Sequence, residues 1–416
     1  MKVILISDYF YPFTPGGSEW SVFELAKSLN HKKVKTLVVS LNYGTKIHDN
    51  YKGINIQRIP FIKKIRNSRS VVNPIWQNNP IFFIISAYFI AKITSTEKPD
   101  IIHVHGKFLI PGAIIAGFIT KIPVIVTIRD KQILCPIGKC FFNPKSFNTC
   151  TFWQYFTDDF PWFIKYYTNR NLLVIAYAFF GAIWSRISGN IIKYLAKKAA
   201  IVTTISNSQR KYLESSGFKN VKVIYNTAEF KSSKIIPKKT KSVLFVGKLS
   251  KGKGIELLID TIEEILKMYK VIFVFAGSIQ SANIEDRLND KQIKPYVKLL
   301  GNVNYKDLPT FYKTSSLLVM PSIYPESFGR AVLESLSVGT PVVVTNTGAL
   351  PEIVEDKVTG RICRPTTKNL KEAILDVLQN EERYKKNIIK KFNFLKEKFM
   401  INPVEEYFYL YKNQTK

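Results

Sequence analysis

Two series of short apolar segments, each segment followed by a helical pattern, constrain the fold of this chain most. The first series consists of Val3–Ile6, Leu37–Ser40, Ile101–His105, Val124–Ile128 and Ile201–Thr204. The second consists of Val243–Val246, Val271–Ala276, Leu317–Met320 and Pro341–Val344. Continuously apolar strands separated by helices are typical of parallel sheets buried on both faces. The pattern therefore predicts an α/β chain with two doubly wound, Rossmann-like domains.

The boundary between the two domains is expected near residue 230, where lysines and serines crowd around Pro237 as in a solvated linker. With 416 residues the chain is long enough for two cores. We expect an N-terminal domain over 1–230, a second over 231–398, and a C-terminal helix over 399–416 that returns to the first. The long segment 131–198 reads as an insertion in the first domain.

The charge balance favours anionic partners, because 61 basic and 31 acidic residues give a formal net charge of +30. The chain has no arginine-rich tail, zinc finger or RNP-type aromatic motif, so we expect no nucleic acid. Nucleotide phosphates and an anionic membrane face remain as candidates. The first residues run directly into a strand, without the pattern of a signal peptide, and four cysteines form no disulfide framework. We expect a cytoplasmic protein.

An apolar, aromatic run at Leu172–Trp184 is followed by Arg186, Lys193, Lys197 and Lys198. A helix lying in a bilayer interface uses aromatic residues beside a basic flank in this way. The run is too short to span a bilayer. The alternative is that it forms a core helix of the first domain, and the sequence leaves both open.

Two loops in the first domain follow strands, where open parallel sheets bind ligands. Gly16 and Gly17 precede an amphipathic helix, so backbone and helix start could approach a phosphate. His105 stands at a strand end, and His103 lies on the same side of that strand. The alternatives are an ordinary turn for the glycine pair and an inert His105.

Lys248 and Lys253 lie in a glycine-rich loop between the strand Val243–Val246 and the next helix. Cationic side chains, a close backbone and a helix dipole form a cradle for a diphosphate. The spacing is not that of a P-loop. The alternative is a basic surface loop on a basic protein.

Two carboxylates, Glu326 and Glu334, flank the start of a helix that follows Leu317–Met320. Ser327 is the expected N-cap, and backbone N–H groups near Phe328 and Gly329 would face a ligand. The alternatives are a solvated turn residue for Glu326 and, for Glu334, an i,i+4 pair with Arg330 on an exposed helix face.

In the second domain the segments VGKLSKGKG, VFAGS, LLGNV and MPSIYPESFGRAVLESLSVGTPVVVTNTGALPEIV resemble family 4 of the retaining glycosyltransferases, the group 1 family with a GT-B fold. GGSE, HVHG and VTTISNSQRKYLESSGF match less distinctively. The resemblance covers most of the chain except 131–198. It implies transfer of a sugar from a nucleoside-diphosphate sugar, most expectedly a UDP- or GDP-sugar, without an essential metal. The acceptor would be a glycan or a lipid-linked molecule, handled on the inner face of the cell membrane.

The resemblance also implies roles for individual residues, in a cleft between the domains. Glu326, His105 and Lys253 would be catalytic. The donor-binding set would be Gly16, Gly17, Lys248, Lys253, Ser327, Phe328, Gly329 and Glu334, with Glu334 on the ribose hydroxyls. The family usually has arginine where Lys248 stands.

Two segments depart from the family pattern. Thr127-Ile-Arg129-Asp130 stands where many relatives carry His-Asp, which would alter acceptor chemistry. Cys135, Cys140 and Cys150 are three thiols in incomplete zinc spacing, so buried free thiols are the default. Three other functions stay open: transfer to a soluble acceptor, a GT-B epimerase, which the acid pair disfavours, and a non-catalytic binding subunit.

Overall fold

The computed structural model describes residues 1–67, 70–130, 172–229, 240–280 and 282–415, together with positions 153, 157 and 160. The chain divides into two compact units. Unit 1 comprises Met1–Thr227 and Pro403–Lys416, and unit 2 comprises Ala228–Asn402. The divisions fall at 227/228 and 402/403, against the expected 230/231 and 398/399. The last helix therefore belongs to the same unit as the first strand.

The described part of unit 1 contains an eight-stranded sheet in the order β3-β4-β2-β1-β5-β6-β7-β8. Its strands are β1 (Lys2–Ile6), β2 (Lys35–Leu41), β3 (His48–Tyr51), β4 (Ile54–Ile59), β5 (Ile101–Val104), β6 (Val124–Ile128), β7 (Ile201–Thr204) and β8 (Lys222–Val223). All neighbours are parallel except β3 and β4. The strand order reverses between β1 and β5: β2 pairs with one side of β1, and β5 pairs with the other. Open α/β sheets bind ligands at such a reversal.

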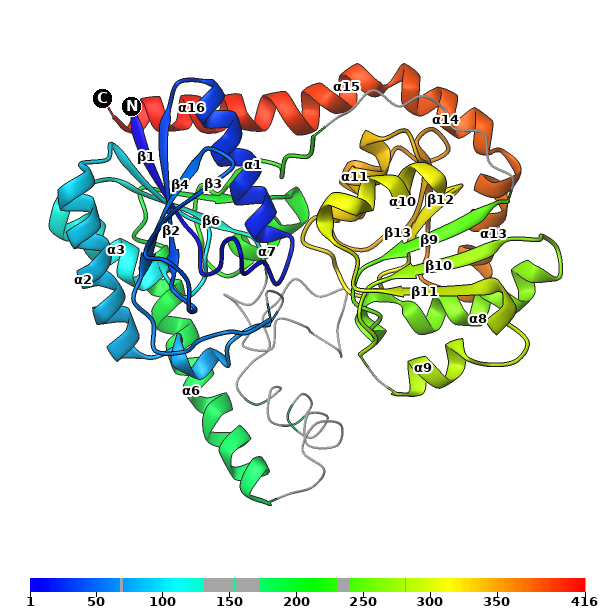
Figure 1. Ribbon diagram of the computed structural model, residues 1–416, viewed down its shortest axis with the longest axis horizontal. Helices are drawn as coiled ribbons and strands as arrows, with labels where there is room; N and C mark the ends of the chain where they lie inside the picture. Colours follow the sequence, from blue (N-terminus) through cyan, green and yellow to red (C-terminus); the bar gives the residue numbers. More distant parts are fainter. Residues whose placement is uncertain are drawn as a thin grey trace. The chain divides into compact units, whose positions relative to one another are not determined.

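Helices cover both faces of this sheet, since alternate residues of β1 enter different cores (Figure 1). The helices are α1 (Ser18–His31), α2 (Pro80–Glu97), α3 (Ile110–Thr120), α6 (Leu172–Ala196), α7 (Asn207–Ser215) and α16 (Asn402–Gln414). Ile4 and Ile6 pack with residues of α2, α3 and α6, and Val3 and Leu5 pack with residues of α1 and α16. The apolar spacing predicted for α1 is confirmed, because its apolar stripe is buried.

Unit 2 has a six-stranded, fully parallel sheet in the order β11-β10-β9-β12-β13-β14. The strands are β9 (Ser242–Val246), β10 (Ile272–Ala276), β11 (Val297–Gly301), β12 (Leu317–Met320), β13 (Val342–Thr345) and β14 (Gly360–Cys363). The helices are α8 (Ile255–Leu266), α9 (Ala282–Leu288), α10 (Leu308–Thr314), α11 (Arg330–Ser337), α12 (Leu350–Ile353), α13 (Thr367–Gln379), α14 (Glu381–Lys390) and α15 (Phe392–Lys396).

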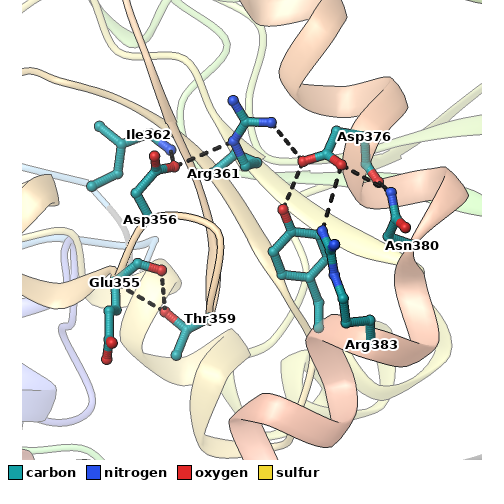
Figure 2. Close-up of polar contacts among 9 residues, drawn as sticks. Glu355, Asp356, Thr359, Arg361, Ile362, Asp376, Asn380 and Arg383 are labelled. Atoms are coloured by element: carbon teal, nitrogen blue, oxygen red, sulfur yellow. Dashed lines mark hydrogen bonds and ion pairs between the residues drawn. The ribbon is translucent and has the colours of Figure 1, made fainter.

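A polar network joins β14 to α13 and α14 (Figure 2). Asp376 of α13 accepts hydrogen bonds from Arg361 of β14 at 2.5 Å and from the Tyr384 hydroxyl of α14 at 2.7 Å. Arg361 also bonds Asp356 at 3.3 Å. The carboxylate thus fixes the last strand of the sheet against two successive helices.

Each strand that the apolar pattern predicts is present in the structure. The pattern misses β3, β4, β8, β11 and β14. β3, with sequence HDNY, and β8, of two residues, lie at the edges of their sheet, and β11 is a largely exposed edge strand. Strands that keep one face in solvent carry no continuous apolar run, so the signal used for prediction is absent from them.

Helix α6 corrects the expectation that the apolar run is too short to span a bilayer. The helix continues past Trp184 to Ala196 and has 25 residues. Its apolar window is long enough to cross a membrane by length and composition, a test that core helices and signal sequences also pass. Only 7% of that window is buried, and Leu173 and Phe180 are exposed. The core packing involves the other end of the helix, at Ile192 and Ala196.

Candidate functional site

In unit 2 three loops follow neighbouring strands of the sheet, and the predicted site residues follow the first two of these strands, β9 and β12. The loop 247–254 follows β9, the loop 321–329 follows β12, and the loop 346–349 follows β13. β9 pairs with β10 on one side and with β12 on the other, so the strand order reverses at β9. Parallel strands present their carboxyl ends at one edge, so the three loops meet at the position where open α/β sheets bind ligands.

Lys253 and Glu326 form the centre of this group. The Lys253 ammonium donates to both carboxylate oxygens of Glu326, at 2.7 and 2.9 Å, and the Ser322 hydroxyl donates to one of them at 2.6 Å. The Glu326 side chain is mostly buried and that of Lys253 is about one-third exposed. A partly buried pair of opposite charges with an open side can exchange one partner for a polar ligand.

Glycines allow the backbone to pack this closely. Gly254 and Gly348 have φ of 70° and 60°, where other residues are strained. A Cβ on Gly254 would lie 1.8 Å from the Pro321 carbonyl oxygen. A Cβ on Gly348 would lie 2.3 Å from the backbone N and O of Glu326. The loop after β12 is therefore held between two backbone segments that tolerate no side chain.

The expected N-cap at Ser327 is wrong. Helix α11 begins at Arg330, and its cap is Gly329, with φ of 107° and no side-chain hydrogen bond. A Cβ on Gly329 would lie 2.6 Å from a methyl group of Leu350, so this cap position accepts no side chain. Ser327 and the buried Phe328 consequently lie in the loop before the helix.

Glu334 has its own set of partners on the inner side of α11. One carboxylate oxygen accepts from Arg330 Nε at 2.6 Å and from the Tyr305 hydroxyl at 3.0 Å. The other accepts from the Tyr312 hydroxyl at 2.9 Å. The i,i+4 pair is thus formed, but both side chains are nearly buried rather than on an exposed face. The ribose contact of Glu334 stays a prediction, as does the diphosphate contact of the exposed Lys248.

In unit 1 a cavity of about 400 Å³ opens at the carboxyl ends of β1, β5 and β6. Predicted residues Gly16 and His105 line it together with Asp8, Glu19 and Arg129. Gly17 caps α1, and the Gly16 N–H donates to the Glu19 carboxylate at 3.0 Å. The glycine pair therefore forms the N-terminal end of α1 beside a polar cavity.

The two histidines of β5 have different surroundings. His103 is structural, since its Nδ1 lies 2.6 Å from the Tyr411 hydroxyl and its Nε2 lies 2.6 Å from the Thr127 hydroxyl. His105 Nδ1 lies 2.9 Å from the Arg129 guanidinium. Its Nε2 is buried and has no hydrogen-bond partner among the described residues. Burial holds the pKa of both imidazoles well below the usual range.

Sequence reasoning missed two acids of this cavity. Asp8 accepts backbone N–H bonds from Phe108 and Leu109, both at 3.1 Å, and burial raises its pKa to about 6. Burial also raises the pKa of Glu19. The available signal was position: Asp8 lies two residues after a strand, and Glu19 lies in the first turn of the helix after the glycine pair.

No group of three or more potential metal ligands occurs among the residues that the structure describes. Cys135, Cys140 and Cys150 lie outside those residues. Burial raises the pKa of the remaining thiol, Cys363, to about 12, which makes it unreactive.

Two family profiles match the chain. The profile described as Glycosyltransferase Family 4 matches residues 15–229, and the profile described as Glycosyl transferases group 1 matches residues 226–392. The first covers more than half of the chain and includes most of the residues that line the cavity of unit 1. The second includes the loops around Lys253 and Glu326.

Individual relatives and solved structures agree with these matches. An uncharacterized glycosyltransferase of Methanocaldococcus jannaschii is 28% identical over 95% of both chains. The gpi3 subunit of phosphatidylinositol N-acetylglucosaminyltransferase from Schizosaccharomyces pombe is 23% identical over 90% of this chain and 72% of that protein. The structure of Anabaena HepE in complex with UDP-glucose has a TM-score of 0.67 at 18% identity, covering 98% and 97% of the two chains. The chain has the GT-B fold.

Proposed function

The chain belongs to the family 4, group 1 glycosyltransferases, and we propose that it moves a sugar from a nucleoside-diphosphate sugar to an acceptor hydroxyl with retained configuration. One observation carries the proposal. Lys253 and Glu326 pair at the ligand-binding edge of the unit 2 sheet. There the cation can bind the diphosphate and the carboxylate can bind the sugar.

The chemistry assigned to this pair follows from charge. The Glu326 carboxylate can only accept, so sugar hydroxyls would donate to it. The leaving nucleoside diphosphate gains negative charge, and the Lys253 ammonium would stabilise that charge as the bond breaks. The acceptor oxygen would attack from the face that the diphosphate leaves, with a phosphate oxygen taking its proton. His105 would contact the sugar or support the departing group.

A UDP- or GDP-sugar is the proposed donor. HepE, which has the same fold, binds UDP-glucose. Lys248, Gly16, Gly17, Ser327, Phe328, Gly329 and Glu334 complete the proposed donor-binding set.

We further propose that the acceptor belongs to a surface polysaccharide, a glycolipid or a lipid-linked oligosaccharide, and that the protein works at the cytoplasmic face of the cell membrane. Exposed Leu173 and Phe180 on α6 and the basic residues that follow support an anionic membrane surface as partner. The gpi3 subunit named above belongs to an enzyme whose name specifies a phosphatidylinositol acceptor.

The test of the reaction is release of nucleoside diphosphate from a panel of UDP-, GDP- and ADP-sugars, with and without a membrane lipid extract. Lys253→Met and Glu326→Gln should each lower the rate about 100-fold or more. Lys291→Met removes an exposed charge of the same unit away from the pair and should leave the rate unchanged. Equal rates for all variants would refute the assignment of the pair.

The membrane partner is tested separately by flotation with vesicles of anionic or zwitterionic lipid at low and high salt. The protein should float with anionic vesicles at low salt, and Phe180→Glu should reduce the bound fraction. Met268→Glu introduces the same charge at an exposed apolar position of unit 2 and should bind like the wild type. Absence of anionic binding by the wild type would refute this part.

Two alternatives stay open: a glycosyltransferase with a soluble acceptor and a non-catalytic binding subunit. The relative from Schizosaccharomyces pombe is itself a subunit of an enzyme, which keeps the second alternative in view. Lipid-independent release would favour the soluble acceptor. Nucleotide binding without release, and a Glu326→Ala variant with unchanged glycan output in cells, would favour the binding subunit.

A further inference from the structure

We propose that Arg129 is a positioning residue that fixes His105 as the tautomer with its proton on Nε2, so that His105 meets the substrate as a neutral hydrogen-bond donor. Arg129 follows β6 and His105 follows β5, and both line the cavity of unit 1. The role in substrate binding rests on the proposed function, but the tautomer itself does not. Arg129 belongs to the segment that departs from the family pattern, and the proposal assigns a role to the arginine in that segment.

The identity of the two groups determines which atom carries the proton. A guanidinium has N–H donors and no acceptor, so it can bond an imidazole nitrogen only through that nitrogen's lone pair. Arg129 Nη2 lies 2.9 Å from His105 Nδ1. Nδ1 therefore accepts, and in a neutral imidazole the proton must then be on Nε2.

A third residue holds the guanidinium in place. Arg129 Nη1 donates to the Asn226 side-chain oxygen at 2.5 Å, in the loop after β8. Both bonds use the planar fork of the arginine, so rotation of the guanidinium would break them together. The orientation of the His105 ring is consequently fixed through Arg129 after β6, which is itself held by Asn226 after β8.

The other ring nitrogen is buried and unsatisfied among the described residues. His105 is buried, it lines the cavity, and its Nε2 has no hydrogen-bond partner among the described residues. A buried N–H without a partner is costly. An oxygen of a bound sugar or acceptor would remove that cost, so the site is prepared for an oxygen that accepts a hydrogen bond.

The surroundings also oppose a charged His105. Burial is the largest cause of its lowered pKa, followed by His103, whose ring centroid lies 3.9 Å away, and Arg129. Other charged or titratable side chains lining the cavity are those of Asp8, Tyr9, Glu19, Lys107 and Asp130. A proton on Nδ1 would point at a cationic donor. These surroundings favour a neutral His105 ring.

Nitrogen NMR of the intact protein tests the tautomer without substrate. The chain has four histidines, of which His31 and His48 are exposed and His103 is the second buried one, so assignment by His105→Gln is practical. Long-range proton–nitrogen spectra of ¹⁵N-histidine protein should show His105 with a pyrrole-like Nε2 and a pyridine-like Nδ1 from pH 8 down to pH 5. A protonated Nδ1 or a charged ring in that range would overturn the proposal.

Variants of Arg129 supply the comparison. Arg129→Met should raise the pKa of His105, because it removes one of the causes that lower it, and should allow the other tautomer. Arg129→Lys keeps a donor-only cation and should preserve the wild-type spectrum. An unchanged His105 spectrum in the folded Arg129→Met protein would overturn the proposal.

Activity is a second, separate readout. The rate for Arg129→Met should fall about tenfold at pH 7 and show a new acidic limb near the raised pKa. His105→Gln, whose amide nitrogen reaches the Nε2 position, should retain more activity than His105→Asn, which reaches only the Nδ1 position. A reversed order would overturn the donor role. If no donor sugar is turned over at all, the proposed function fails while the tautomer result stands.

Discussion

Replacing Gly348 by alanine tests whether the backbone around Glu326 determines the activity of unit 2. Gly348 pairs with Glu326 in an isolated parallel bridge, and the next residue, Ala349, donates its N–H to the Glu326 carbonyl at 2.9 Å. This backbone contact keeps the Glu326 side chain beside the Lys253 ammonium.

The expected magnitude has two parts. At φ of 60° a residue with a Cβ costs about 1–2 kcal/mol of stability. In addition, the new Cβ would lie 2.3 Å from Glu326 backbone atoms, about 1 Å short of the 3.4 Å at which ordinary contact begins. A catalytic group displaced by about 1 Å can lose about 100-fold in rate. Gly348→Ala should thus lose far more activity than its stability loss explains.

Gly301→Ala is the matched control. Gly301 belongs to the same unit and has φ of 62°, but a Cβ there would meet nothing within 4 Å. Both variants should lose the stability that a Cβ costs at φ near 60°, and Gly348→Ala should lose more in urea unfolding, because its Cβ also meets the Glu326 backbone. Only Gly348→Ala should lose activity in the nucleoside-diphosphate release assay when both are assayed at a temperature where they are folded. If both variants keep the same rate at a temperature where both are folded, the backbone of Glu326 does not set the site and the reasoning is refuted.

Two further predictions concern stability and pH. Burial raises the pKa of Asp8 from 3.8 to about 6, so its contribution to stability is present below pH 4 and is lost as pH rises through 6. Between pH 4 and pH 6 the free energy of unfolding should fall by about 3 kcal/mol less in Asp8→Asn than in the wild type. The same pH dependence in both proteins would contradict the burial argument. Burial alone would raise the pKa of Asp376, but hydrogen bonds from Tyr384 and Arg361 lower it. Its contribution is therefore present at neutral pH and lost in acid. Asp376→Asn should cost about 1 kcal/mol at pH 7 and progressively less as the pH falls below 3.8, and a loss that is the same at every pH would exclude ionisation as the cause.

Much of the fold could be predicted from local pattern. Apolar strands and the buried stripe of α1 depend on spacings of two to four residues along the chain, and these are visible in the sequence. The edge strands β3 and β11 could not be found in this way, because one face of each stays in solvent. The start of α11 was misplaced because its cap is Gly329, in the left-handed conformation and without a capping side chain.

The sequence by itself determined the two parallel sheets, the positions of the glycine-rich loops and the presence of Lys253, Glu326 and His105 at strand ends. Tertiary structure alone decided which of these residues meet. Lys253 reaches Glu326 because β9 and β12 are neighbours in the sheet, and Arg129 reaches His105 because β6 lies beside β5. Strand order is a property of how the whole chain packs, and residues distant along the chain carry no local pattern that records it.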